Sequence, residues 1–338
     1  MRNPEQSYSN ESFEFSDKEK SEEWQKEKRK NPESYECVKE LDAGERISSL
    51  IESKDGYKVI TGLFDGKIKI LDKETGKSQI MEGGHKDFVE SLLETEDGKY
   101  ILSGSRNEIK IWDGETKRCL DTIHCRDYHP LLVEAKDRNH FIFASEDGVI
   151  RIVDKETRKV SKFLHTETPI QFLEESKDGK QVICSSGYGE IRILNKGTGE
   201  KVKAIDLKDN VHSFIQSKDG KQFIVGLDGG IVKILDKETG KEIKTLEAFK
   251  GDDRWKEKNF VRSLLESKDG DKLIVGLTDG KIEILDKKTG ENLGEIDNEG
   301  GLAASALIES KYGNEIIAGL WTGEIKIWAK KNNENKSD

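Results

Sequence analysis

The chain alternates short apolar runs with polar turns that contain glycine and aspartate. In residues 217–241, SKDGKQFIVGLDGGIVKILDKETGK, apolar runs at 222–227 and 231–236 are bounded by Asp-Gly and Thr-Gly turns. β-Branched residues suit pleated, buried strands, and glycine supplies the positive φ that tight hairpin turns require. The pattern predicts two β-hairpins that share one strand.

This unit recurs seven times along the chain. Successive copies are spaced by 41, 41, 41, 41, 50 and 43 residues, measured at the last residue of the third strand of each copy: Asp72, Asp113, Asp154, Asn195, Asp236, Asp286 and Ala329. A fixed period near 41 with several short strands per unit is typical of a propeller blade and not of a helical solenoid. We therefore predict an all-β fold, a seven-bladed β-propeller with four-stranded antiparallel blades.

The seventh copy lacks a fourth strand, because the residues after Ala329 are polar. The segment 35–42, YECVKELD, places Val38 and Leu41 three residues apart, as Val202 and Ile205 are in the fourth copy. Pairing an N-terminal strand with the C-terminal strands removes the exposed edges that an open array would leave. We predict that residues 35–42 complete the last blade and close the ring.

The domain organisation follows from the limits of the repeat. Residues 1–34 form a polar arm, partly helical or disordered, residues 35–329 form a single propeller domain, and residues 330–338 form a disordered polar tail. The arm has a capping box at Ser16 and Glu19 but few large apolar residues. It is either a frayed arm or one that orders on a partner, with Phe13, Phe15 and Trp24 as anchors.

Composition narrows the class of partner and the compartment. The net charge is −10 with both signs mixed along the chain, which argues against nucleic acid as a ligand. No apolar run approaches the roughly 18 residues of a membrane span, and no secretory signal is present, so we expect no membrane association and a cytoplasmic protein. The four cysteines lack a CxxC pair or a framework of close spacings and are interpreted as reduced thiols.

The second copy resembles the WD-repeat family of propellers. Gly84-His85, the LSGS segment at 102–105 and the IKIWD segment at 109–113 follow the order of that family's motif, and the resemblance extends over residues 35–329. The resemblance implies a hydrogen-bonded network of a His, a Ser or Thr, a turn Asp and a Trp. Here His85, Ser103 and Trp112 match, but the turn at 106–107 contains no Asp, so apolar packing is expected to carry more of the stability.

Comparison of the copies separates two rims of the expected ring. The turns SKDGK and KETGK are nearly uniform, whereas the turns between second and third strands and the connections between copies vary. We assign function to the variable rim, where the resemblance also implies partner binding. Exposed aromatic and Arg side chains dominate interface energies, and the candidates on this rim are Phe64, Phe88, Arg106, Arg126, Tyr128, Tyr188, Asp252, Arg254, Trp255 and Trp321. Alternatively, some of these rings only cover blade ends, and the insertion 248–260 that holds three of the candidates is a neutral loop.

Two further clusters offer chemistry. One position of the inner strand is acidic in six copies and Gln in the other: Glu52, Glu94, Glu134, Glu175, Gln216, Glu266 and Glu309. These carboxylates either face the central channel and hold a cation, or are exposed near their turns and pair with lysines of the same or the next copy. The second cluster, Cys119, His124, Cys125 and His129, has no standard zinc spacing and fits ordinary rim residues.

The sequence contains no GxSxG, HExxH or P-loop motif. We predict a non-catalytic protein–protein interaction scaffold without a cofactor, a monomeric propeller within a heteromeric complex that binds a protein or peptide on the variable rim. The alternative is an enzyme or cation binder that uses groups at the central channel.

Overall fold

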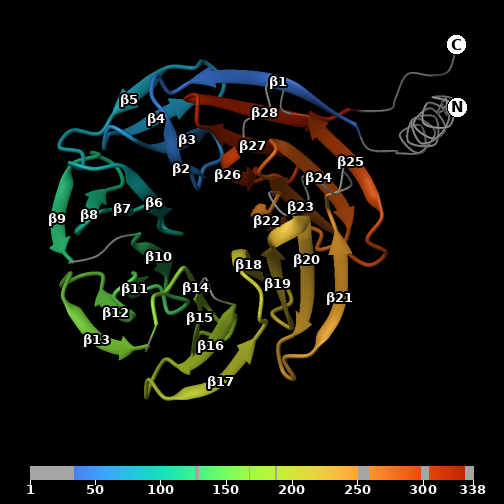
Figure 1. Cartoon of the computed structure of the whole chain (residues 1–338). Helices are drawn as coiled ribbons and strands as arrows, with labels where there is room; N and C mark the ends of the chain where they lie inside the picture. Colours follow the sequence, from blue (N-terminus) through green and yellow to red (C-terminus); the bar gives the residue numbers. More distant parts are fainter. Residues whose placement is uncertain are drawn as a thin grey trace, which may run out of the picture.

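The computed structural model describes residues 34–125, 129–166, 168–186, 189–249, 259–297 and 304–331. These residues form seven four-stranded antiparallel sheets arranged around a central axis (Figure 1). The predicted all-β, seven-bladed propeller is therefore confirmed. The described residues contain one helical element, the short 3₁₀ turn η1 (Asp228–Gly230), and none of their helices is long and apolar enough to cross a membrane.

Each blade is one sheet, and in blades 1 to 6 the strands follow one another in chain order from the centre of the ring outward. The first three blades are β2 (Ile47–Glu52), β3 (Lys58–Leu63), β4 (Ile68–Asp72) and β5 (Ser78–Ile80); β6 (Val89–Glu94), β7 (Tyr100–Ser105), β8 (Glu108–Asp113) and β9 (Cys119–His124); and β10 (Leu131–Glu134), β11 (His140–Ala144), β12 (Val149–Asp154) and β13 (Val160–His165). The next three are β14 (Phe172–Glu175), β15 (Gln181–Ser185), β16 (Glu190–Asn195) and β17 (Lys201–Asp206); β18 (Val211–Gln216), β19 (Gln222–Leu227), β20 (Ile231–Asp236) and β21 (Glu242–Glu247); and β22 (Val261–Glu266), β23 (Lys272–Leu277), β24 (Lys281–Asp286) and β25 (Asn292–Asp297).

Blade 7 joins the two ends of the described chain. It contains β26 (Ala304–Glu309), β27 (Glu315–Leu320) and β28 (Glu324–Lys330), with β1 (Tyr35–Asp42) as its outer strand. In Figure 1 the blue β1 lies along the red β28. The register pairs Tyr35 with Lys330 and Asp42 with Glu324. The predicted closure of the ring by residues 35–42 is confirmed at both boundaries.

The apolar spacing that identified β1 reflects a β-bulge. The β1–β28 register skips Val38, and the β16–β17 register skips Val202 in the same way. Both valines are exposed, whereas Leu41 and Ile205 are buried. A bulge twists an outer strand and blunts its free edge, which protects the ring from pairing with other chains.

The core lies between the blades as separate apolar clusters. At the closure, Leu41, Ile325 and Ile327 of blade 7 pack with Ile47 and Leu50 of blade 1. Neighbouring blades cover both faces of each sheet, so the third strands have buried side chains on both sides. In β8, for example, Ile109 and Ile111 are buried on one face and Trp112 on the other. This packing explains how a chain with 33% hydrophobic residues fills seven small cores.

The acidic positions of the inner strands link adjacent blades. Lys287 Nζ lies 2.6 Å from Glu266 Oε1 in blade 6, and the Lys218 N–H of blade 5 donates to Glu266 Oε2 at 2.5 Å. We call such a carboxylate, with its lysine and the amide of the preceding blade, an inter-blade bridge. The amide contact recurs from Lys54 to Glu94, from Glu96 to Glu134, from Lys136 to Glu175, from Lys268 to Glu309 and from Lys311 to Glu52.

This arrangement supports pairing with lysines and not a ring of free carboxylates that holds a cation. Glu52 pairs with Lys73 at 2.8 Å and Glu175 with Lys196 at 2.6 Å. The expectation that these groups are exposed is wrong, because the Glu175 side chain is fully buried. Burial is tolerated because protein donors satisfy the charge.

Candidate functional site

Three aromatic side chains that were predicted from different copies of the repeat lie together. The rings of Phe64 and Phe88 stack with centroids 5.3 Å apart and planes inclined by 15°. Trp321 meets Phe64 edge-on at 6.4 Å. Phe64 and Trp321 are 36% and 45% exposed, so the group presents an apolar surface to solvent. We call these three residues the aromatic row.

The aromatic row depends on closure of the ring. Phe64 lies in the turn after β3, where its N–H donates to the carbonyl of Arg46 at 3.0 Å. Trp321 lies in the β27–β28 turn of blade 7, whose Gly323 has a φ of +94° and approaches the Glu45 carbonyl closely. A side chain at Gly323 would collide with that carbonyl, so glycine is required there. The two rings are therefore neighbours because β1 places blade 7 against blade 1.

Arg262 extends the aromatic row on blade 6. Its guanidinium carbon lies 5.2 Å from the centroid of the Trp321 ring, which is within the range of a cation–π contact. The β22–β23 register skips Arg262 between Val261 and Ser263, and such a bulge redirects a side chain. Arg262 Nε is buried and has no hydrogen-bond partner among the described residues. Burial lowers the pKa of Arg262.

Arg262 was missed by the sequence analysis, although a signal was present. The inner-strand position that Arg262 occupies is skipped by the register in several blades and differs between them: Ser48, Glu90 and His212 occupy it in blades 1, 2 and 5. The comparison of copies was applied to the turns and not to this position. Extending it to the strand starts would have identified a variable ring of residues.

The other predicted rim residues have mixed outcomes. Arg106 Nη1 lies 4.0 Å from the Asp87 carboxylate, next in the chain to Phe88. The remaining candidates lie outside the described residues: Arg126, Tyr128, Tyr188, Asp252, Arg254 and Trp255 on the rim, and Phe13, Phe15 and Trp24 in the arm. Of the predicted set, the structure thus brings Phe64, Phe88 and Trp321 together and places Arg106 near them.

Blade 2 contains a buried hydrogen-bonded network. Trp112 Nε1–H donates to Ser103 Oγ at 2.8 Å, and the Ser103 hydroxyl lies 2.6 Å from His85 Nε2. His85 Nδ1 lies 2.8 Å from Glu108 Oε1. The carboxylate that the turn at 106–107 lacks is therefore supplied by the first residue of β8. The network that the missing turn Asp put in doubt is therefore present in blade 2.

The network fixes the protonation state of His85. Burial lowers the pKa of His85, and the Glu108 carboxylate opposes this shift only in part. The neutral ring donates from Nδ1 to Glu108 and accepts the Ser103 hydroxyl at Nε2. A second proton would occupy Nε2 and break the bond from Ser103.

The stability of the protein is therefore expected to depend on pH through His85. Below the usual histidine pKa of about 6.5 the unfolded chain binds a proton that the folded chain excludes. The free energy of unfolding therefore decreases as the pH is lowered, by at most about 1.4 kcal/mol per pH unit. Urea unfolding of the wild type and His85→Gln between pH 7.5 and 5 measures this. The advantage of the wild type should shrink as the pH falls.

His129 also titrates, with a pKa shifted in the opposite direction, but its contribution is the same in the wild type and in His85→Gln. The ion pair of His129 with Glu90, at 2.9 Å, raises the pKa of His129, but this residue is present in both chains and cancels in the difference. A wild-type advantage that stays constant with pH would show that His85 is not kept neutral.

The four cysteines are free thiols, Cys37 and Cys119 exposed and Cys125 and Cys184 buried. Burial raises the pKa of Cys184 to about 12, so this thiol stays protonated at neutral pH. Within the described ranges no group of three His, Cys, Asp or Glu side chains could hold a metal ion. The residues of the candidate zinc cluster are divided between exposed and buried positions, and His129 pairs with Glu90 instead.

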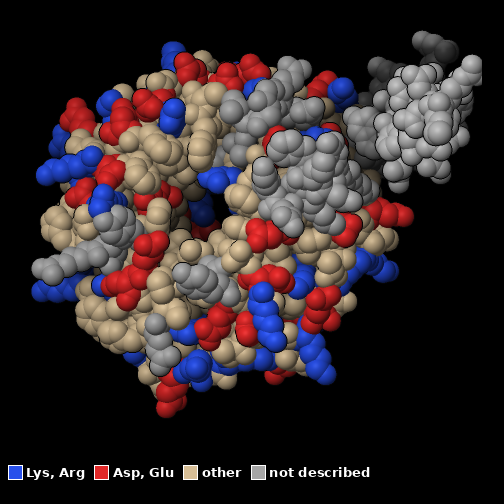
Figure 2. All heavy atoms as spheres, viewed as in Figure 1, with Lys and Arg blue, Asp and Glu red and all other residues tan. Residues whose placement is uncertain are grey.

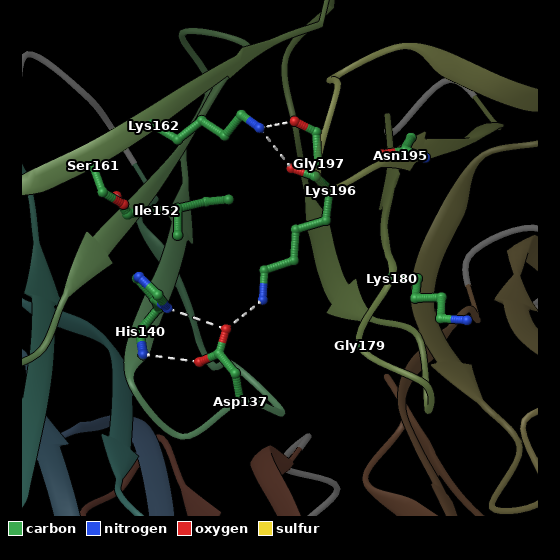
Figure 3. Close-up of a pocket in the computed structure, with 10 residues that line it drawn as sticks. All are labelled: Asp137, His140, Ile152, Ser161, Lys162, Gly179, Lys180, Asn195, Lys196 and Gly197. Carbon is green, nitrogen blue, oxygen red and sulfur yellow. Dashed lines mark hydrogen bonds and ion pairs between the residues drawn. The ribbon is translucent and has the colours of Figure 1, made fainter.

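A cavity of about 660 Å³ lies between blades 3 and 4 on the uniform rim (Figure 3). Lys196 and His140 both point toward Asp137, at 3.0 and 3.1 Å. Burial favours the neutral acid, but hydrogen bonds from the Asn139 N–H, Lys196 and His140 lower the pKa of Asp137 to about 2. Lys162 donates to the carbonyls of Lys196 and Gly197.

The charged side chains of this cavity thus hydrogen-bond to other groups of the protein: Lys196 and His140 contact Asp137, and Lys162 donates to a backbone carbonyl. The contact of Lys162 is also a feature of the repeat, because Lys39, Lys203 and Lys244 donate to the corresponding turns of other blades. The cavity is therefore a gap between repeated turns, and the aromatic row is the better candidate for a site.

Figure 2 shows lysine and arginine interspersed with aspartate and glutamate around the central opening, over the part of this face that the structure describes.

Comparison with known proteins agrees with this architecture. A family profile described as "WD domain, G-beta repeat" matches residues 76–113, which include β6, β7 and β8 of blade 2, and one described as "Outer membrane protein assembly factor BamB" matches residues 146–307. The chain is 30% identical over 80 residues to a THO complex subunit 6 homolog of Danio rerio, a match that covers 23% of this chain and 24% of the relative. It is 27% identical over 121 residues to GID complex subunit 7 of Schizosaccharomyces pombe, covering 34% and 24%.

A third relative carries the repeat in its name. WD repeat-containing protein 55 of Arabidopsis thaliana is 27% identical over 96 residues, covering 28% of this chain and 27% of the relative. The matches span about a quarter of the length of each of these three relatives. Together with the seven closed blades and the His85–Ser103–Trp112 network, they support a WD-repeat propeller family. The chain is thus similar to the WD-repeat propellers, with the family's repeat matched in residues 76–113.

Proposed function

We propose that this propeller is a non-catalytic subunit of a protein complex and binds a protein or peptide through its variable rim. The observation that carries the proposal is the aromatic row with Arg262 at one end. Exposed aromatic rings beside an arginine have the composition of the few residues that dominate binding energies in protein interfaces. Two relatives are named as subunits of the THO and GID complexes, which supports a role in an assembly.

The remaining rim candidates extend the proposed surface. Arg106 lies near the Phe88 end through its contact with Asp87. Arg126, Tyr128, Tyr188, Asp252, Arg254 and Trp255 are proposed as further contacts because they belong to the same variable turns and connections. Phe64, Phe88 and Trp321 already pack together in the ring, which favours binding by a preformed surface.

Replacement of Trp321 is expected to weaken partner binding by about tenfold or more, since loss of an interface aromatic costs about 2 kcal/mol. Tagged wild type and Trp321→Ala are used to recover complexes from the native source, and the Kd of each recovered partner is then measured with purified protein. The matched control is Tyr312→Ala, an exposed aromatic residue in the turn between β26 and β27 on the uniform rim. Equal Kd values for the wild type and Trp321→Ala would exclude the aromatic row as the site.

A further inference from the structure

The aromatic row has an arginine near each end. Arg262 of blade 6 lies over the ring of Trp321 of blade 7. Arg106 of blade 2 reaches the carboxylate of Asp87, which is next in the chain to Phe88. Between them the ring centroids are separated by 6.4 Å from Trp321 to Phe64 and by 5.3 Å from Phe64 to Phe88. The surface is therefore a line of cation, three rings and cation that crosses four blades.

The chemistry of this line selects an acidic, aromatic segment. The buried Nε of Arg262 has no acceptor within the described part of the chain, and a guanidinium is matched in shape and charge by one carboxylate. A doubly charged phosphate is less suited, since Asp87 and Glu90 add negative charge to this rim. The rings between the cations require apolar side chains, and phenylalanine can stack or pack edge-on there.

The arm of this chain carries such a segment. Residues 11–17 read ESFEFSD. In an extended conformation alternate side chains share one face at a spacing of about 6.7 Å, so that face would present Glu11, Phe13, Phe15 and Asp17. The segment has acids at both ends and two rings between them, which complements a surface with arginines near both ends and three rings between them, and its spacing of about 6.7 Å is close to that of the aromatic row.

We propose that residues 11–17 bind to the aromatic row of their own chain. Phe13 and Phe15 pack against Trp321, Phe64 and Phe88. The side-chain carboxylate at one end of the segment, that of Glu11 or Asp17, pairs with Arg262. The arm then covers the surface that the proposed function assigns to a partner, so a partner must displace it.

The connection is long enough for this contact. Asp17 is 18 residues before Tyr35, a span of up to about 60 Å. Tyr35 pairs with Lys330, and the other end of β1 pairs with Glu324, three residues after Trp321. The arm therefore needs to return along one eight-residue strand, about 26 Å, to reach the variable rim. A tether of this length gives an effective concentration in the millimolar range.

Photo-crosslinking within the full chain tests the contact. The photoreactive amino acid p-benzoylphenylalanine is introduced at position 321 or at position 88, and the dilute protein is irradiated, digested and analysed by mass spectrometry. We expect crosslinks from both positions to the peptide containing residues 11–17, in protein of monomer mass. The matched control is the same amino acid at position 312 on the uniform rim, which should give no such crosslink.

Variants of the two partners define the chemistry. Phe13→Ser with Phe15→Ser should reduce the crosslink yield about tenfold, and Arg262→Gln several-fold, with unchanged circular dichroism. The proposal is overturned if neither position crosslinks to residues 11–17, or if the crosslinks occur only in protein of dimer mass, which would assign the arm to a second copy. Because no outside partner is present, a failed partner recovery leaves this test unaffected.

Discussion

Removal of residues 1–42 is expected to prevent stable, cooperative folding, with a loss on the order of 5 kcal/mol or more, which is comparable with the whole stability of many domains. The deletion removes β1, and with it the pairing to β28 from Tyr35 to Asp42 and the buried side chain of Leu41. It also opens the cluster shared by blades 7 and 1 and leaves β28 as an unpaired edge. Thermal and urea unfolding, with light scattering for aggregation, measure the effect.

The matched control is a chain that begins at Ser34. Ser34 accepts the N–H of Lys331, and Tyr35 begins the paired strand, so this shorter deletion retains the closure. It should unfold within a few degrees of the full chain. Full thermal stability of the chain that begins at residue 43 would contradict closure of the ring by β1.

Glu266→Ala is expected to lower the free energy of unfolding by about 3–5 kcal/mol, because it leaves the Lys287 ammonium and the Lys218 N–H without their acceptor. The carboxylate bonds to Lys287 of its own blade and to the Lys218 N–H of blade 5, and its side chain is only 4% exposed. The loss should be seen in urea unfolding and also as faster amide exchange at Lys218.

The ring itself provides the control for this substitution. Blade 5 has Gln216 at the equivalent position, and its side-chain oxygen Oε1 accepts a hydrogen bond from Lys237 Nζ at 3.0 Å. Glu266→Gln keeps the acceptor and should cost only about 1 kcal/mol. If Glu266→Ala leaves the free energy of unfolding unchanged, the inter-blade bridge contributes nothing to stability.

The fold could be predicted from the sequence because each signal is local and repeated. The bounds expected for β19, β20 and β1 coincide with those observed. Each strand is limited by a turn whose Asp or Gly is required by the backbone, and seven copies average out the ambiguity of any one. The closure followed from the same logic, since a spacing shared with the fourth copy marked the missing strand.

The site was less predictable because it depends on contacts across the ring. The variable turns indicated Phe64, Phe88 and Trp321, but their stacking requires blades 7, 1 and 2 to meet. Arg262 was missed because a bulge, which the pattern of residue types does not reveal, directs it toward Trp321. Glu108 was missed for a related reason, because it replaces a turn aspartate from a different position in the blade.

The contact between Trp321 and Phe64 has a consequence for synthesis of the protein on the ribosome. The two residues are brought together by β1, which is made first, and by β28, which is made last. A nascent chain that has not yet released residues 324–330 from the exit tunnel therefore lacks the aromatic row, although six blades are already complete in sequence. Assembly of a complex through this surface would thus admit finished subunits and exclude prematurely terminated ones.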